Sequence, residues 1–316
     1  MRHSPRLIAA LIGGLFMPAV GVSAPLAYVA NEKSGTVSVI DTSTDTVVRT
    51  LQPSQRPRGI AIAPDGKRLY LTDEPTAALV VVDTESGRTV ANWKVGDSPE
   101  GAHVSDDGKL ISVAVEEEDK VALLDAASGQ ILAKIPVKGE NPEHAVFSPD
   151  GRWLYASAED AEQVDVIEVS SRRQVAQIPV GKRPRGIGFT PDGKRAYVAC
   201  ELASTVYAID VATHKVVASI PAGNFSNGIA ITPDGKRVFV SNGRDGTVMA
   251  IDTASNKMIA TIPVGQRPWN MAITPDGAKL YVANGRSGSV SVIDTVQLKR
   301  IGEVSVGELP WGVAIR

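Results

Sequence analysis

The segment IAPDGKRLYL, residues 62–71, places a Pro-Asp-Gly turn between two short apolar runs, and this pattern predicts a β-hairpin. Nearly the same ten residues recur along the chain. The other copies are VSDDGKLISV (104–113), FSPDGRWLYA (147–156), FTPDGKRAYV (189–198), ITPDGKRVFV (231–240) and ITPDGAKLYV (273–282). The aspartates of successive turns are 42 or 43 residues apart. One structural unit is therefore repeated along the whole chain.

Each unit contains four β-prone runs separated by turn residues. In one unit these runs are GIAIA, RLYLT, ALVVVD and TVANWKV, which we name strands A, B, C and D. The unit has no useful length of helical periodicity. Four antiparallel strands in about 40 residues match the size of one propeller blade, whereas the rungs of β-helices are much shorter.

The strand count predicts seven blades in a closed ring. Strands A and B each occur seven times, but the chain opens with strands B, C and D (26–51) and closes with a lone strand A, WGVAI (311–315). Together the two ends make one complete blade. We therefore predict an all-β, seven-bladed β-propeller with four antiparallel strands per blade, closed by the C-terminal strand A joining the N-terminal strands B, C and D.

Composition narrows the range of partners and chemistries. The chain has 316 residues, with 33 Lys and Arg against 35 Asp and Glu, and its net charge of −2 argues against nucleic acid as the main partner. Cys200 is the only cysteine, which excludes an intrachain disulfide and a thiol-rich metal site. Because Glu201 follows it and would raise a thiol pKa, we interpret Cys200 as an ordinary buried residue.

The first residues have the pattern of a secretory signal peptide. Arg2 and Arg6 precede an apolar stretch from residue 7 to about 22, and small residues follow. A membrane anchor would need about 20 consecutive apolar residues. We predict a cleaved signal peptide over residues 1–24, cut after Ser23 or Ala24, and a single propeller domain over residues 25–316. The expected mature protein is a periplasmic monomer without a membrane span.

Antiparallel strands send alternate loops to opposite faces of the ring. The A–B and C–D turns share one face, where the same turn chemistry recurs in every repeat: Gly for positive φ, Asp for side-chain capping, Pro for a fixed φ. The D–A and B–C loops share the other face, where the repeats differ. We therefore expect function on the second face.

The residues that enter strand A beside the central channel are the candidate ligand-binding site. They are Arg56, Arg58, Glu100, Glu143, Arg183, Arg185, Asn227, Arg267, Trp269, Asn270 and Trp311. Arg56 and Arg58 are expected to face Arg183 and Arg185 across the channel mouth. These four arginines are expected to bind carboxylates, and the tryptophans to stack a flat ring or anchor a partner. The alternative is that the arginines pair with glutamates between blades and that the tryptophans only cap the channel.

A metal site is a second candidate. His103 and His144 stand where other repeats carry small residues, and with Glu100 and Glu143 they could ligate a divalent metal. The run EEED (116–119), near Glu159 and Asp160, suits Ca²⁺, although a solvated acidic loop has the same composition. No Gly-x-Ser-x-Gly, phosphate-loop or His-Glu-x-x-His motif occurs, so no catalytic residue is predicted and the cofactor stays unknown.

The repeats resemble the YVTN-type β-propeller repeat over residues 28–316. The segments FVSNGRDGTVMAIDT (239–253) and YVANGRSGSVSVIDT (281–295) carry the pattern. The opening LAYVANEKSGTVSVIDT (26–42) and the ending GELPWGVAIR (307–316) resemble the periplasmic seven-repeat propellers associated with pyrroloquinoline quinone-dependent alcohol catabolism. That resemblance implies an accessory role beside quinoprotein dehydrogenases and a transport system.

Two classes of function follow. The first is an exported, non-catalytic binding or accessory protein that takes a small anionic ligand or a periplasmic protein partner. The second is a metal-dependent propeller enzyme of the lactonase or lyase type, or a metal or tetrapyrrole carrier, that uses His103 and His144.

Overall fold

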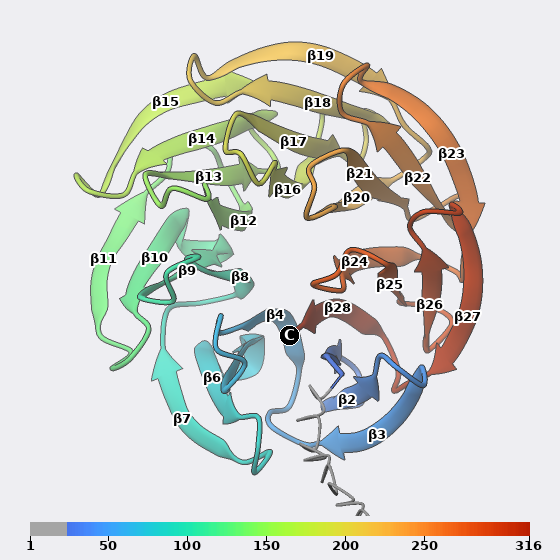
Figure 1. The fold of residues 1–316 in the computed structure, drawn as a ribbon. Coiled ribbons are helices and arrows are strands. Elements are labelled where there is room, and N and C mark those ends of the chain that lie inside the picture. Colours follow the sequence, from blue (N-terminus) through green and yellow to red (C-terminus); the bar gives the residue numbers. More distant parts are fainter. Residues whose placement is uncertain (1–23) are drawn as a thin grey trace, which may run out of the picture.

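The computed structural model describes residues 24–316 and shows seven four-stranded antiparallel sheets arranged around a central channel (Figure 1). The predicted all-β, seven-bladed propeller is confirmed. The predicted signal peptide lies, except for Ala24, outside the described residues. No helix within residues 24–316 has the length and apolar character needed to cross a membrane.

The blades are numbered 1 to 7 from the first described strands. In every blade strand A is innermost. The A strands of blades 1 to 7 are β28 (Pro310–Ile315), β4 (Pro57–Ile62), β8 (Pro99–Val104), β12 (Pro142–Phe147), β16 (Pro184–Phe189), β20 (Ser226–Ile231) and β24 (Pro268–Ile273). The B strands, in the same order, are β1 (Leu26–Asn31), β5 (Arg68–Asp73), β9 (Leu110–Val115), β13 (Trp153–Ala158), β17 (Arg195–Cys200), β21 (Arg237–Asn242) and β25 (Lys279–Asn284).

Strands C and D complete each blade towards the outside. The C strands are β2 (Thr36–Asp41), β6 (Ala78–Asp83), β10 (Lys120–Asp125), β14 (Gln163–Glu168), β18 (Thr205–Asp210), β22 (Thr247–Asp252) and β26 (Ser289–Asp294). The D strands are β3 (Thr46–Leu51), β7 (Thr89–Lys94), β11 (Ile131–Pro136), β15 (Arg173–Pro179), β19 (Lys215–Pro221), β23 (Lys257–Pro263) and β27 (Lys299–Ser305).

The two ends of the described chain share blade 1. Its strand order is β28-β1-β2-β3, and β28 pairs with β1 in antiparallel register, for example at Tyr28 and Ala314. Leu26 N donates to Arg316 O at 2.9 Å, and Arg316 N donates to Leu26 O at 3.1 Å. The predicted closure of the ring by the C-terminal strand is confirmed.

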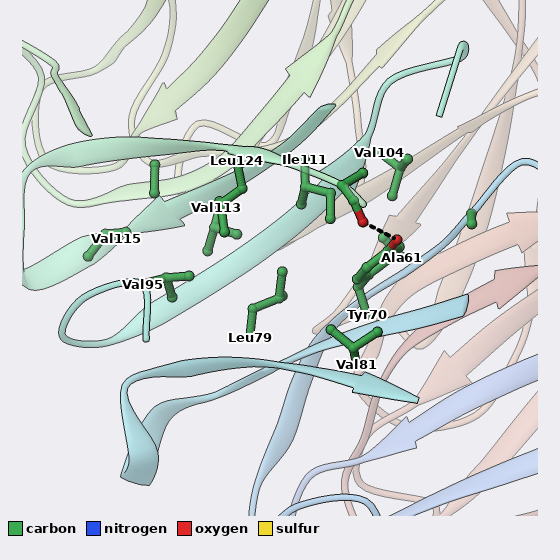
Figure 2. Packing of buried hydrophobic residues seen from close by; sticks show 13 residues of the cluster. Ala61, Tyr70, Leu79, Val81, Val95, Val104, Ile111, Val113, Val115 and Leu124 are labelled. Carbon is green, nitrogen blue, oxygen red and sulfur yellow. Dashed lines mark hydrogen bonds between the residues drawn. The ribbon is translucent and has the colours of Figure 1, made fainter. Parts of the chain in front are cut away.

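The core is divided into seven apolar clusters, each formed between two neighbouring blades. Figure 2 shows the cluster between blades 2 and 3, where Leu79 and Val81 of β6 approach Ile111 and Val113 of β9. The Tyr70 hydroxyl of the same cluster donates to the Ala126 carbonyl at 3.3 Å. Because every cluster needs two blades, no blade buries its apolar surface alone.

The two faces of the ring differ as expected. On the turn face, formed by the A–B and C–D turns, Gly66 takes a φ of +74° and Asp65 Oδ1 accepts a hydrogen bond from Lys67 N at 2.9 Å. On the variable face, formed by the D–A and B–C loops, the B–C loops of blades 2 and 3 carry the short 3-10 helices η1 (Glu74–Thr76) and η2 (Glu116–Glu118).

Removal of residues 311–316 should unfold the whole ring. The truncation removes the hydrogen-bond partner of β1 and the buried side chains of Trp311, Val313 and Ala314. We expect the cooperative thermal transition, followed by far-UV circular dichroism, to be lost or lowered by more than about 10 °C, since about 1 kcal/mol already shifts the midpoint by 2–4 °C in a chain of this size. Arg316→Ala is the control, because it keeps the backbone hydrogen bonds to Leu26 and removes only the side-chain contact with Pro64 O. Equal melting of the truncated protein and the control would contradict the closure argument.

Candidate functional site

Bulges at the start of strand A aim the candidate side chains at the channel mouth. In blade 2 the pairing of β4 with β5 jumps from Pro57 to Ile60, and β16 and β24 show the same jump from Pro184 to Ile187 and from Pro268 to Met271. A bulge leaves its residues outside the regular ladder and redirects their side chains. The second residue of each A strand, at or beside this irregularity, is one of Arg58, Glu100, Glu143, Arg185, Asn227, Trp269 and Trp311.

Arg58 joins blades 2, 3 and 1 at the mouth. Its Nη1 contacts Oε1 of Glu100, which is fully buried at the start of β8. Its guanidinium also lies over the ring of Trp311, 5.6 Å from the ring centroid. A buried carboxyl group and an indole face therefore hold this cation in place.

Arg185 is the centre of the charge network. Its guanidinium contacts Glu143 at 2.5 Å, Glu159 at 2.7 Å and Glu201 at 3.2 Å. Glu143 and Glu159 belong to blade 4, whereas Glu201 follows β17 in Arg185's own blade 5. All four side chains are at least 90% buried, so the cation compensates for charges that have little access to water.

The remaining arginines of the predicted site are also paired. Arg56 contacts Glu32 at 2.5 Å and Glu74 at 2.6 Å, and Arg183 contacts Glu159 at 2.9 Å. Arg267 reaches from blade 7 to Glu201 of blade 5, at 2.9 Å. Its guanidinium also stands over the rings of Phe225 and Trp269, at 5.1 and 5.8 Å from their centroids.

In the structure Arg56, Arg58, Arg183 and Arg185 are therefore paired with glutamates, as the alternative interpretation expected, and are not free cations facing one another. Each of the four contacts at least one glutamate.

The site residues predicted from the sequence did not include Glu159, Glu201 and Phe225. Alignment of the repeats could have identified Phe225, because it occupies the D–A loop position that Arg183 and Arg267 occupy in blades 5 and 7.

A cavity of about 140 Å³ lies in the channel below this network. Its walls are mainly the apolar or small residues of the A strands, with His103, His144 and Asn270 as the polar members and Trp311 among the lining residues. The ring of His144, from blade 4, stacks on Trp311 of blade 1 with centroids 5.7 Å apart and planes inclined by 28°. This contact crosses the channel. Gly101 makes room for it, since a Cβ there would lie 2.5 Å from His144 Nδ1.

Besides Glu159 Oε1, which has only its ionic contact with Arg185, four buried polar atoms around the mouth and cavity have no hydrogen-bond partner within the described protein. They are Arg58 Nε, Glu100 Oε2, His144 Nε2 and Asn270 Nδ2. Buried polar groups are nearly always satisfied by protein, water or ligand. This group is the strongest sign of a binding position in the channel. Asn227 is buried at the same level on β20, and Trp269 is partly exposed on β24.

Burial sets the protonation of the site. Burial and the neighbouring charge of Glu143 raise the pKa of Glu100 to about 10. Burial alone would raise the pKa of Glu143, but Arg185 and Arg58 outweigh it and hold that pKa at about 2. Burial also lowers the pKa values of His103 and His144 to about 4, so both imidazoles are neutral at pH 7. One buried carboxyl is thus kept protonated while its neighbour is ionised.

The donor set falls short of the predicted metal site. Both histidines line the cavity, but His144 stacks on Trp311 and His103 lies 6.0 Å from the Phe147 ring. Within residues 24–316 no group of three or more His, Cys, Asp and Glu side chains is placed to hold a metal ion. Catalytic zinc sites use three protein ligands, so two imidazoles alone do not match that pattern.

Two other sequence interpretations concern residues away from the cavity. The carboxylate of Glu118 in the acidic run is paired with Lys120 at 3.2 Å and Lys134 at 2.9 Å, and Glu116 accepts a hydrogen bond from the Ser98 hydroxyl at 3.1 Å.

Cys200 is fully buried at the end of β17, and burial raises its pKa to about 12. Such a thiol is a poor nucleophile at neutral pH.

Three family models match parts of the chain. They are described as "Lactonase, 7-bladed beta-propeller" (residues 170–308), "SMP-30/Gluconolactonase/LRE-like region" (residues 23–160) and "Cytochrome D1 heme domain" (residues 105–228). Each match spans less than half of the chain. No curated protein matches it.

Two solved structures are similar over most of the chain. Hydrazine synthase of Kuenenia stuttgartiensis is 25% identical with a TM-score of 0.78, and the match covers 85% of this chain and 92% of that one. A functionally unknown protein from Desulfotomaculum acetoxidans DSM 771 is 18% identical with a TM-score of 0.81, covering 92% of this chain and 98% of that one. The second likeness concerns the fold alone.

Substitution of Arg185 by Met should destabilise the protein strongly. The change leaves Glu143, Glu159 and Glu201 buried without their shared cation, and breaking such a buried network costs about 3–5 kcal/mol. Urea denaturation at pH 7 measures the free energy of unfolding. Arg56→Met is the matched control, because Arg56 is exposed and its pairs should contribute about 1 kcal/mol or less. Equal losses in the two variants would show that Arg185 is not the centre of the network.

The two neutral imidazoles should make stability fall on acidification. Unfolded histidines take up protons near pH 6.5, whereas His103 and His144 in the folded state do so only near pH 4. Their contribution is therefore lost as the pH falls between these values. Between pH 7 and pH 5 the free energy of unfolding should fall less in His103→Gln/His144→Gln than in the wild type. The difference should be about 1–2 kcal/mol for each imidazole replaced.

Denaturant unfolding at the two pH values measures this difference. Glu100 acts in the opposite direction, since its raised pKa favours the folded state at low pH, but it is present in both proteins and largely cancels in the comparison. Parallel pH dependences of the wild type and the double variant would contradict the assignment of neutral imidazoles in the folded state.

Proposed function

We propose that this chain is an exported, non-catalytic binding or accessory propeller that acts through its variable face. The main support is that buried polar atoms of His144 and Asn270, which line the channel cavity with Trp311, have no hydrogen-bond partner in the described protein. Arg58 Nε and Glu100 Oε2, at the mouth, are also without a partner. A concave position with a few convergent polar groups and perturbed pKa values is the default hypothesis for a binding site.

The size of the cavity limits what can enter it. A volume of about 140 Å³ is close to that of engineered protein cavities that hold one benzene molecule. A fused-ring quinone carrying carboxylates is larger than this. It would lie on the mouth, with its plane against Trp311 or Trp269, and only one polar group would reach the Asn270 amide and the His144 imidazole.

The finer parts of the proposal come from the sequence. The resemblance of the repeats to periplasmic propellers associated with pyrroloquinoline quinone-dependent alcohol catabolism supports an accessory role beside a quinoprotein dehydrogenase or its transport system. Removal of residues 1–24 would leave residues 25–316 as one propeller domain in the periplasm. In this proposal the protein is a monomer that binds a small anionic ligand or a periplasmic protein partner.

A second candidate function is an enzyme or carrier. The partial matches to lactonase, gluconolactonase-like and cytochrome D1 heme models favour it, as do the two neutral imidazoles, since neutral imidazole is the metal-binding form of histidine. The residues fit it less well, because the two imidazoles lack a third protein ligand and the cavity is far smaller than a tetrapyrrole.

Pyrroloquinoline quinone should bind the purified protein and change its tryptophan fluorescence, since Trp311 and Trp269 border the mouth. We expect His144→Ala/Asn270→Ala to weaken this binding about tenfold or more, because each lost hydrogen bond to a buried ligand group costs about 1 kcal/mol. The control is Asn92→Ala/His214→Ala, a pair of the same residue types outside the channel. Fluorescence titration at pH 7 is the measurement.

Two results would count against the proposal. Identical titrations for the wild type and the channel variant, or no binding at all, would remove the small-ligand form. Stoichiometric metal in the purified protein, measured by elemental analysis and lost in His103→Ala/His144→Ala, would favour the enzyme or carrier instead.

A further inference from the structure

Blades 6 and 7 carry a groove on the variable face that is separate from the channel cavity. Its volume is about 470 Å³. Three arginines from three different loops line it: Arg244 between β21 and β22, Arg267 between β23 and β24, and Arg286 between β25 and β26. Phe225 and Gln266 are also lining residues.

Two of these arginines are free of the pairing that neutralises the channel mouth. Among residues 24–316, the guanidinium groups of Arg244 and Arg286 form no ion pair and no hydrogen bond, and both residues are exposed. The arginines of the mouth all contact glutamates. Positive charge on this face is therefore only partly compensated over blades 6 and 7.

The sequence explains why the compensation is missing here. Blades 1 to 5 carry a glutamate directly after strand B, whereas blades 6 and 7 carry Gly243 and Gly285. A Cβ at Gly243 would lie 3.2 Å from Arg267 Nη1, and one at Gly285 would lie 3.0 Å from Trp269 Cε3. The glycines therefore remove two carboxylates and also make room for Arg267 and Trp269.

The one carboxylate that lines the groove is already engaged. Asp245 Oδ2 accepts a hydrogen bond from Asn224 N at 2.7 Å, and Oδ1 accepts one from Asn224 Nδ2 at 2.9 Å. In blade 7 the same position is Ser287, whose hydroxyl accepts a hydrogen bond from Gln266 N at 2.8 Å. Blade 7 thus keeps the hydrogen bond from the D–A loop backbone to this side chain, but without a negative charge.

Phe225 helps to fix the cations in the groove. Arg244 stands 5.6 Å and Arg267 5.1 Å from its ring centroid. Cation–π contacts of this kind orient a guanidinium and leave its N–H edge for a planar oxyanion. Because the three guanidiniums come from separate loops, an anion with two or more charged groups can contact two of them at once.

We infer that the groove lined by Arg244, Arg267 and Arg286 is a binding site for a small multivalent oxyanion, a polycarboxylate or a polyphosphate. Carboxylate and phosphate groups share the bidentate geometry that arginine recognises. The site goes beyond the proposed function, since it does not involve the channel cavity, His144 or Asn270. It also moves the expected anion from the paired arginines of blades 2 and 5 to the unpaired ones of blades 6 and 7.

Isothermal titration calorimetry of the purified protein at low ionic strength tests this site, with citrate and inorganic pyrophosphate as separate probes. We expect at least one of them to bind with one-to-one stoichiometry, and the stronger probe to identify the anion class. Arg244→Gln/Arg286→Gln should weaken that binding at least about tenfold, the equivalent of about 1.4 kcal/mol. Both residues are exposed on loops, so the variant should keep its fold, which circular dichroism confirms.

Two control variants locate the effect. Arg88→Gln/Arg152→Gln removes the same charge from exposed arginines of the turn face and should leave binding unchanged. His144→Ala/Asn270→Ala should also leave it unchanged. The inference is overturned if neither anion binds, if the groove variant titrates like the wild type, or if only the channel variant loses binding.

Discussion

Pairing between β28 and β1 closes a ring in which every apolar cluster is shared by two neighbours. Because the core is divided into seven such clusters, each blade depends on the blades at both of its sides. An open seam would expose the facing surfaces of blades 1 and 7 and leave β1 and β28 without their pairing partner. The hydrogen bonds between Leu26 and Arg316 therefore join residues 290 positions apart and support surfaces all around the molecule. Such non-local pairing also means that the fold can be completed only after the last strand is available.

The channel mouth shows how a closed ring can hold many charges with little access to water. Arg185 and three glutamates from two blades form one network, and beside it the Arg58 guanidinium contacts the Glu100 carboxyl. Buried pairs of this kind add little to stability compared with apolar packing, but the loss of one partner is costly. They therefore help to fix blade 2 against blade 3 and blade 4 against blade 5 at the mouth. Blades 6 and 7, which lack the glutamates, have exposed arginines in place of the network, and the variable face is electrostatically asymmetric.

The sequence predicted the fold in detail because its signals are local. Pro-Asp-Gly turns at a constant spacing indicate the blades, and incomplete units at both ends indicate the shared sheet. The site could be predicted only as a set of positions. Side-chain geometry decides that Arg185 contacts Glu143, Glu159 and Glu201 together, and the spacing of residues along the sequence does not contain this information. The stacking of His144 on Trp311 depends on the width of the channel. The groove of blades 6 and 7 was missed because the space that Gly243 and Gly285 leave for Arg267 and Trp269 can be seen only in three dimensions.

Trp311 belongs to β28, the same strand that closes the ring, and it contacts both Arg58 and His144. A molecule bound against this indole would therefore be in contact with the seam itself. Its binding free energy would be lost whenever β28 detached, so occupancy of the mouth would suppress sub-global opening and slow amide hydrogen exchange in β28 and β1. Ligand binding at the mouth and closure of the ring by β28 are thus thermodynamically coupled through the side chain of Trp311.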